Sequence, residues 1–126
     1  MIGRGELFSQ VLLECIDEGL AVLGTEPRQA VYQFLLTICS LPREEIPNHV
    51  ADFDAGLKKA LGGAFRVIER LILRKLFERT GSSFREIPGV DFNDYVLDAR
   101  RRFEILSHKH DEPVDGSRSK KGQSSG

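Results

Sequence analysis

The sequence predicts an all-α protein, a compact orthogonal bundle of about five helices that form a single domain. Its 126 residues are 40% apolar and 29% charged, and the two kinds are interleaved, which is typical of a folded globular chain. Apolar residues recur every three or four positions in five segments, which is the spacing of one buried helical face. We find no segment of useful length with the alternation of a strand, so no sheet is expected.

The first two predicted helices span residues 6–23 and 27–38 and meet at a tight turn. Gly24 is placed to end the first helix in the left-handed conformation. Thr25 is then expected to cap the second helix, with Pro27 in its first turn. The predicted inward residues are Leu7, Phe8, Val11, Leu12, Cys15, Ile16, Gly19 and Leu23 in the first helix, and Ala30, Val31, Phe34, Leu35 and Ile38 in the second.

A loop through Ile46-Pro47 is expected to lead to a third helix over residues 53–61, capped by Asp52. Gly62-Gly63 then forms the corner before the most apolar helix, residues 64–80. Their predicted inward residues are Phe53, Leu57, Ala60 and Leu61, then Phe65, Val67, Ile68, Leu71, Ile72 and Leu76. Leu73 and Phe77 fall on the far side of the fourth helix, so that either a later helix or another subunit must cover them.

The last predicted helix spans residues 92–106 and is capped by Asp91. Its predicted buried face consists of Phe92, Tyr95, Val96, Ala99, Phe103 and Leu106. From Ser107 onward the chain is polar, which predicts a disordered C-terminal tail. The expected organisation is therefore one helical domain, 1–107, and a flexible polar tail, 108–126.

Metals and cofactors are not expected from the residue types and spacings. Cys15 and Cys39 lie in apolar helical patterns, which favours buried reduced thiols. His49 has no partner at metal spacing, and His108 and His110 fall in the predicted tail. Gly62-Gly63 lacks the strand and the lysine of a phosphate-binding loop. We therefore predict no metal and no cofactor.

An enzyme is not expected either, because no pairing of a nucleophile with a base can be recognised. A site assembled from distant residues would escape this test. A cavity with converging carboxylates, or a strongly perturbed pKa in a cleft, would be its structural sign. The absence of a catalytic role is therefore an expectation that the tertiary structure could reverse.

Charge and hydropathy suggest a cytoplasmic protein. The formal net charge is −1, which argues against a globally basic nucleic-acid binder. Residues 1–63 carry five Lys/Arg against nine Asp/Glu, and residues 64–107 carry nine against seven. No secretory pattern opens the chain, and no apolar run approaches the roughly 20 residues of a membrane span. We therefore expect no membrane contact.

A stripe of arginines is the strongest feature outside the predicted core. Arg66, Arg70 and Arg74 follow one another every four residues on the fourth helix. With Arg100 and Arg101 they could contact phosphates or an acidic partner. The interpretation that we prefer is a solvated face neutralised by Glu69, Glu78 and the acidic first helix. A helix-turn-helix at Gly62-Gly63 is disfavoured because the fourth helix is too apolar to lie open in a DNA groove.

Residues 10–81 resemble an archaeal helical family, the Nitrosopumilus output domain. The similar segments are Ile16-Asp17-Glu18-Gly19-Leu20, Leu23-Gly24, Gln29-Ala30-Val31-Tyr32, Arg43-Glu44-Glu45-Ile46-Pro47, Phe53 with Gly56-Leu57, Leu61-Gly62-Gly63-Ala64, and Ile68-Glu69-Arg70-Leu71-Ile72 through Leu76 to Gly81. The molecular function of that family is unassigned. Some members accompany signalling modules, which implies a non-catalytic domain that receives a signal or binds a protein.

The functional expectation is thus a non-catalytic interaction or output domain with a signalling or regulatory role, which self-associates through Leu73 and Phe77. A protein partner or a homodimer is the predicted assembly. The alternative is a small regulator that binds nucleic acid through Arg66, Arg70 and Arg74, aided by Arg100 and Arg101.

Overall fold

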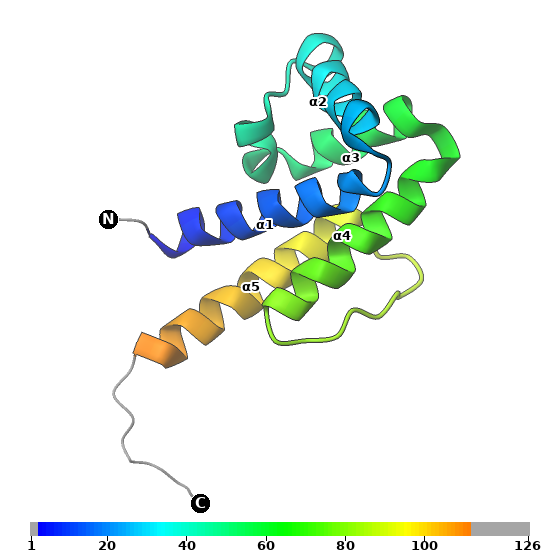
Figure 1. The fold of residues 1–126 in the computed structure, drawn as a ribbon. Coiled ribbons are helices and arrows are strands. Elements are labelled where there is room, and N and C mark those ends of the chain that lie inside the picture. Colours follow the sequence, from blue (N-terminus) through cyan, green and yellow to red (C-terminus); the bar gives the residue numbers. More distant parts are fainter. Residues whose placement is uncertain (1–2, 112–126) are drawn as a thin grey trace, which may run out of the picture.

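The fold is all-α, as predicted (Figure 1). The structure, a computed structural model, describes residues 3–111 and their side chains other than those of Arg4 and residues 106–111. These residues contain no strand. The helices are α1 (Arg4–Ala21), α2 (Thr25–Cys39), α3 (Val50–Leu61), α4 (Phe65–Arg79) and α5 (Phe92–Asp111), with two 3₁₀ helices, η1 (Arg43–Asn48) and η2 (Gly62–Ala64). None of the described helices is long and apolar enough to span a membrane.

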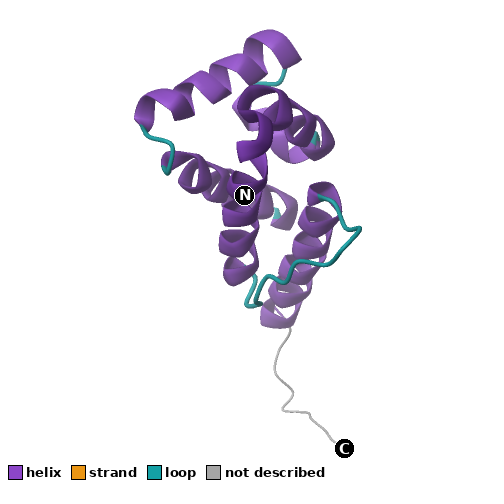
Figure 2. Ribbon diagram, turned by 90° about the vertical axis from the view of Figure 1, so that its right-hand side faces the viewer, coloured by secondary structure: helices purple, strands orange, loops and turns teal. Residues whose placement is uncertain are grey.

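Helix α1 lies at the centre of the bundle and contacts α2, η1, α4 and α5 (Figure 1). Helices α2 and α3 pack against each other on one side of α1, and α4 and α5 pack on the other. The loop 80–91 returns along α4 and α5, so these two helices run in the same direction (Figures 1 and 2). One continuous core joins all five helices, with Phe8, Leu12, Ile16, Leu35, Phe53, Leu57, Ile72, Leu76 and Val96 among its most buried side chains.

Two glycines allow the closest helix contacts in the bundle. A Cβ on Gly19 of α1 would lie 2.6 Å from Cγ1 of Ile72 in α4. A Cβ on Gly56 of α3 would lie 2.5 Å from Cδ2 of Leu35 in α2. Real Cβ atoms do not approach other carbons this closely, since atoms in protein interiors are already in van der Waals contact. Glycine at both positions therefore sets the distance between the paired helices.

Several predicted boundaries are corrected by the structure. Gly24 does take a positive φ, of 103°, but it caps the start of α2, so Thr25 is the first residue of that helix rather than its cap. The segment expected as a loop forms η1, with Ile46 and Pro47 buried. Helix α3 begins at Val50, which places Asp52 in its first turn instead of at the cap. Asp91 caps α5 as predicted, because its Oδ1 accepts the backbone N–H of Asp94 at 2.9 Å.

Helix α5 continues to Asp111, so the predicted boundary between residues 107 and 108 falls inside a helix. The spacing of apolar residues ended at Leu106, and a polar final turn leaves no periodic signal in the sequence. The remainder of the predicted tail, 112–126, lies outside the described residues, as do the side chains of Leu106, His108 and His110.

Four residues that were predicted to face the core are exposed: Leu7, Ala30, Ile38 and Val67. Ile38, for example, is 64% exposed. Leu7, Ile38 and Val67 lie within a turn of a helix end. Periodicity marks a face of a helix, but only a packed neighbour buries it.

Candidate functional site

Leu73 and Phe77, predicted to form a self-association surface, are buried within the chain. They are 3% and 5% exposed. The Phe77 ring packs edge-on against Phe84 of the loop 80–91, with 5.7 Å between centroids, and the Arg102 guanidinium of α5 lies 5.8 Å from the Phe77 ring centroid. The loop and α5 therefore cover this face, which corrects the assignment of Leu73 and Phe77 to an interface between copies.

The arginine stripe is divided among different surroundings. Arg66 is exposed, and its guanidinium lies 5.8 Å from the Phe65 ring centroid. Arg70 Nε lies 3.3 Å from Glu86 Oε1 in the loop 80–91. Arg74 is exposed. The stripe is therefore interrupted by an ion pair at its middle position.

Arg100 and Arg101 do not form a common surface with the stripe. The Arg100 guanidinium turns inward, where it lies 5.2 Å from the Phe8 ring centroid and donates to the Pro47 carbonyl at 3.3 Å. Arg101 is exposed and lies 3.5 Å from Asp98. Arg100 thus joins α5 to α1 and η1, and its assignment as a partner contact is corrected.

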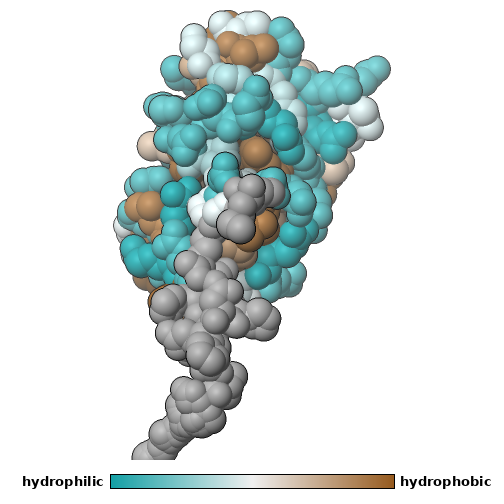
Figure 3. All heavy atoms as spheres, turned by 90° about the vertical axis from the view of Figure 1, so that its left-hand side faces the viewer, coloured by the Kyte–Doolittle hydropathy of each residue, from teal (hydrophilic) through white to brown (hydrophobic). Residues whose placement is uncertain are grey.

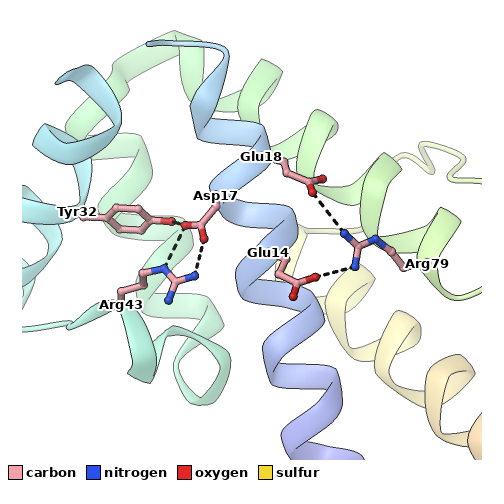
Figure 4. Close-up of polar contacts among 6 residues, drawn as sticks. All are labelled: Glu14, Asp17, Glu18, Tyr32, Arg43 and Arg79. Carbon is pink, nitrogen blue, oxygen red and sulfur yellow. Dashed lines mark hydrogen bonds and ion pairs between the residues drawn. The ribbon is translucent and has the colours of Figure 1, made fainter. Parts of the chain in front are cut away.

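The acidic face of α1 binds neighbouring elements through two sets of polar contacts (Figure 4). Arg79 of α4 donates to Glu14 at 2.9 Å and to Glu18 at 3.3 Å. Asp17 accepts hydrogen bonds from the Tyr32 hydroxyl of α2 and from Arg43 of η1, with Arg43 Nη2 at 2.5 Å. Burial would raise the pKa of Asp17, but the hydrogen bonds from Arg43 and Tyr32 outweigh burial and lower this pKa. These contacts hold the bundle together.

Asp17→Asn is expected to reduce the free energy of unfolding at neutral pH by about 1 kcal/mol, a modest loss because water partly screens the Arg43 pair. The lowered pKa of Asp17 means that its contribution is full above pH 3.8 and is lost as the pH falls through the folded-state pKa. Urea denaturation from pH 7 down to pH 3 should show the deficit of the variant shrinking with acidity. A deficit that is constant with pH would contradict this.

A cleft of about 240 Å³ lies where α3, α4 and α5 meet the loop 80–91. We call it the α4 cleft. Its charged lining residues are Asp54 and Lys58 of α3, Arg66, Glu69 and Arg70 of α4, and Glu86 and Asp91 of the loop. Its apolar walls are Phe65, Leu73, Phe84, Val90, Phe92 and Tyr95.

Glu69 is the most unusual group of the α4 cleft. Its Oε2 atom is buried and has no hydrogen-bond partner among the described residues. Burial, together with a side-chain hydrogen bond to Asp54 and the negative charge of that carboxylate, raises the pKa of the Glu69 carboxyl to about 9, and the Lys58 ammonium lowers it only slightly. Glu69 therefore holds a proton at neutral pH, and its neutral carboxyl shares the inner part of the cleft with Asp54.

The inner and outer parts of the α4 cleft differ in charge. Asp54, beside Glu69, has a side chain only 19% exposed, and its nearest described cation is the Lys58 ammonium at 3.6 Å. Arg66 and Arg70 lie at the exposed edge, with Glu86 beside Arg70. The inner part is therefore acidic, whereas the exposed edge carries two arginines, Arg66 and Arg70, and two acidic residues, Glu86 and Asp91.

The loop 80–91 separates the α4 cleft from a second cavity of about 410 Å³. Phe84 and Glu86 face the cleft, while Ser83, Arg85 and Ile87 face the second cavity. The Tyr95 hydroxyl anchors the loop, because it accepts the N–H of Ile87 and donates to its carbonyl. In the second cavity Asp98 already pairs with Arg101 and Arg102. The α4 cleft is therefore the stronger candidate.

Metal ligands and reactive thiols are not assembled in the part of the chain that the structure describes. No group of three or more His, Cys, Asp or Glu side chains is placed to hold a metal ion there. His49 lies 3.7 Å from Asp52 and 3.9 Å from Glu45. Burial raises the pKa of the Cys15 thiol to about 11, so this cysteine stays protonated at neutral pH.

Glu69 was predicted to lie on a solvated face and to neutralise the arginine stripe, but its carboxyl is largely buried in the α4 cleft. Glu69 lies four residues after Phe65 and four before Leu73, so it shares their face of α4. A carboxyl in line with two large apolar residues was a signal of burial that could have identified it. The position of Asp54 beside it depends on how α3 packs and could not be read from spacing.

Comparison with protein-family models, curated proteins and solved structures finds no match to this chain. The resemblance to the Nitrosopumilus output domain therefore remains a prediction, and the function rests on the geometry of the site.

Proposed function

We propose that this chain is a non-catalytic regulatory domain that binds a small ligand in the α4 cleft. The observation that carries the proposal is the pair of carboxyls of Glu69 and Asp54 in the cleft, in which one Glu69 oxygen is buried and receives no hydrogen bond from the described residues. Leaving a buried polar atom unpaired costs about 1–3 kcal/mol. A ligand that donates a hydrogen bond to this oxygen would recover that free energy. A carboxyl that lies in a cleft and has a strongly perturbed pKa is a frequent sign of a functional site.

Binding fits the α4 cleft better than covalent catalysis does. The paired carboxyls are the sign that would have indicated an enzyme, and they could exchange a proton with a ligand. However, the described lining of the cleft contains no serine, cysteine or histidine, and the Asp54 carboxylate, the acidic candidate for a nucleophile beside Glu69, already pairs with Lys58 at 3.6 Å. The Tyr95 hydroxyl is engaged by the backbone of Ile87. These contacts favour a receptor for a ligand over a site of covalent chemistry.

A regulatory role is supported by the place of the loop 80–91. This loop contributes Phe84, Glu86 and Val90 to the cleft, and Phe84 also packs against Phe77 of α4. A ligand in the cleft would therefore contact the same segment that covers the core. Binding energy could then shift the position of the loop, which is how a ligand changes a surface seen by a partner.

The binding proposal can be tested with four probes that share a four-carbon chain: butanol, butanoate, butylammonium and 4-aminobutanoate. Amide chemical shifts of the intact chain should be followed by NMR at matched ionic strength. We expect at least one probe to shift the signals of Glu69, Phe84 and Val90 saturably. Ligands of this size bind at about millimolar affinity, so probe concentrations should reach about 20 mM.

Leu73→Phe provides the matched variant, because a larger side chain on the cleft wall reduces the available volume. It should weaken the binding of whichever probe binds the native chain. If none of the four probes shifts the cleft signals, the binding proposal fails.

Self-association and nucleic-acid binding remain predictions. Leu73 and Phe77 no longer support the first, and Figure 3 shows apolar side chains in separate patches among hydrophilic ones on the face that it draws. Of the five arginines assigned to nucleic acid, Arg70 and Arg101 have acidic neighbours and Arg100 turns inward. The ligand-binding proposal is therefore the one that the geometry favours.

A further inference from the structure

We propose that the ligand of the α4 cleft carries an organic ammonium group, which donates hydrogen bonds to the carboxyls of Asp54 and Glu69. This inference rests on the proposed function, because it names the chemical class that the cleft would bind. The inner part of the cleft offers acceptors in excess of donors. Asp54 has a single described cationic neighbour, Lys58, and Glu69 Oε2 receives no hydrogen bond from a described donor, since its nearest polar neighbour is the Asp54 carboxyl.

The cleft already holds an ammonium group in the expected surroundings. The Lys58 Nζ atom lies 3.6 Å from Asp54 and 5.3 Å from the Phe65 ring centroid. A carboxylate and an aromatic face together are the usual surroundings of bound alkylammonium ions. The Lys58 side chain is 54% exposed, so it can turn to solvent and leave its place to a ligand. The chain itself thus shows that this position suits an ammonium ion.

The other ligand charges fit less well. An anion in the inner part would meet the Asp54 carboxylate at close range, and like charges repel strongly in a partly desolvated site. A metal ion needs several grouped ligands, which the described residues do not provide. A carboxylate at the far end of an ammonium ligand would instead reach the exposed edge, where Arg66 and Arg70 lie. We therefore expect the inner part of the cleft to bind a cationic group, and its exposed edge to accept an anionic group of the same ligand.

Binding should also release a proton. At neutral pH Glu69 is protonated, but an ammonium ion beside it stabilises the carboxylate. The other charged or titratable groups around it are Asp54 and Lys58 of α3, Arg66 and Arg70 of α4, Glu86 and Asp91 of the loop, and Tyr95 of α5. The affinity for an ammonium ion should therefore rise with pH, by up to about tenfold per unit while Glu69 stays protonated in the free protein.

The cleft is small for a metabolite site, since ligand pockets usually enclose about 300–1,000 Å³. A volume of about 240 Å³ suits a ligand of few heavy atoms. The four-carbon probes are therefore of suitable size for testing the charge of the ligand.

The test compares the four probes by NMR titration and by calorimetry with the intact chain. Butylammonium and 4-aminobutanoate should bind, and butanol and butanoate should bind at least about tenfold more weakly, which corresponds to one charged hydrogen bond. Calorimetry at pH 7 in two buffers of different ionisation enthalpy should show proton release on binding. Tighter binding of 4-aminobutanoate than of butylammonium would support the role of the two arginines at the exposed edge.

Asp54→Asn should weaken butylammonium about tenfold or more. Asp52→Asn is the matched control, because Asp52 lies on the same helix with its side chain 72% exposed and outside the cleft lining. This control should bind as the native chain does. The circular dichroism of both variants should match that of the native chain, which confirms that they are folded.

The outcomes separate the two proposals. If butanol or butanoate binds in the cleft as tightly as the ammonium probes, the ammonium inference is overturned while the cleft remains a binding site. If Asp54→Asn binds butylammonium with unchanged affinity, the inference is overturned as well. If no probe shifts the cleft signals, the proposed function itself fails.

Discussion

Ile72→Ala is expected to lower the free energy of unfolding by about 2–5 kcal/mol, because the truncation removes buried methyl and methylene groups and leaves a cavity. Ile72 is fully buried at the crossing of α4 and α1. Helix α1 contacts every other α-helix in the described chain apart from α3, so a defect at this crossing weakens the centre of the bundle. Urea denaturation followed by circular dichroism measures the loss.

The same crossing allows a sharper experiment with Gly19→Ala. An added methyl group would lie 2.6 Å from Ile72 Cγ1, and this overpacking should cost about 1–3 kcal/mol. Because Ile72→Ala removes Cγ1, the double variant should lose less stability than the sum of the two single losses. Simple additivity of the two losses would show that Gly19 and Ile72 are not in contact.

Gly5→Ala is the matched control for the change at Gly19. Gly5 lies in the same helix, and a Cβ there would meet nothing within 4 Å. Alanine should therefore stabilise the chain by about 0.5–1 kcal/mol through its better helix propensity. The same substitution on one helix should thus have opposite signs at positions 5 and 19.

Glu69→Gln is expected to stabilise the protein increasingly as the pH rises, up to about pH 9. In the folded chain the pKa of Glu69 is raised to about 9, whereas in the unfolded chain it is near 4.5. Between these values the folded state binds more protons than the unfolded state, so the native chain loses stability as the pH rises. Glutamine is uncharged at every pH and has a similar shape, so it avoids this loss.

The measurement is the melting temperature of both chains from pH 5 to pH 9. The difference in favour of Glu69→Gln should grow with pH throughout this range, because the raised pKa of Glu69 lies at its upper end. Glu78→Gln, an exposed change on the same helix, serves as the control. If the difference in melting temperature between the native chain and Glu69→Gln does not change with pH, Glu69 is ionised in the folded protein.

This pH dependence bears on the binding proposal. A carboxyl that destabilises the folded chain at neutral and alkaline pH is retained more easily if it serves a function, since binding sites often sacrifice stability. Glu69→Gln should therefore gain stability and lose proton release on binding of butylammonium. If Glu69→Gln gains stability and its binding of butylammonium is unchanged, Glu69 destabilises the folded chain without contributing to binding.

The amino-acid sequence was sufficient to predict the five α-helices and, to within two residues, most of their ends. These features depend on local interactions: apolar spacing marked α1 to α5, Asp91 capped α5 through its own side chain, and Gly62-Gly63 formed the corner before α4. Each signal lies within a few residues of the structure that it predicts. Local chemistry is sufficient there, because helix ends and turns are stabilised by neighbours in the chain.

The neighbours that cover each helix face, and the charged groups that meet, depend on the tertiary structure. The path of the loop 80–91 buried Leu73 and Phe77 and also enclosed Glu69 beside Asp54 of α3. Arg100 turned inward because Phe8 and Pro47 lie beside α5. Burial and pKa depend on the positions of elements far apart in the sequence. Periodicity could therefore identify Glu69 as a residue of α4, but not as a protonated carboxyl in a cleft.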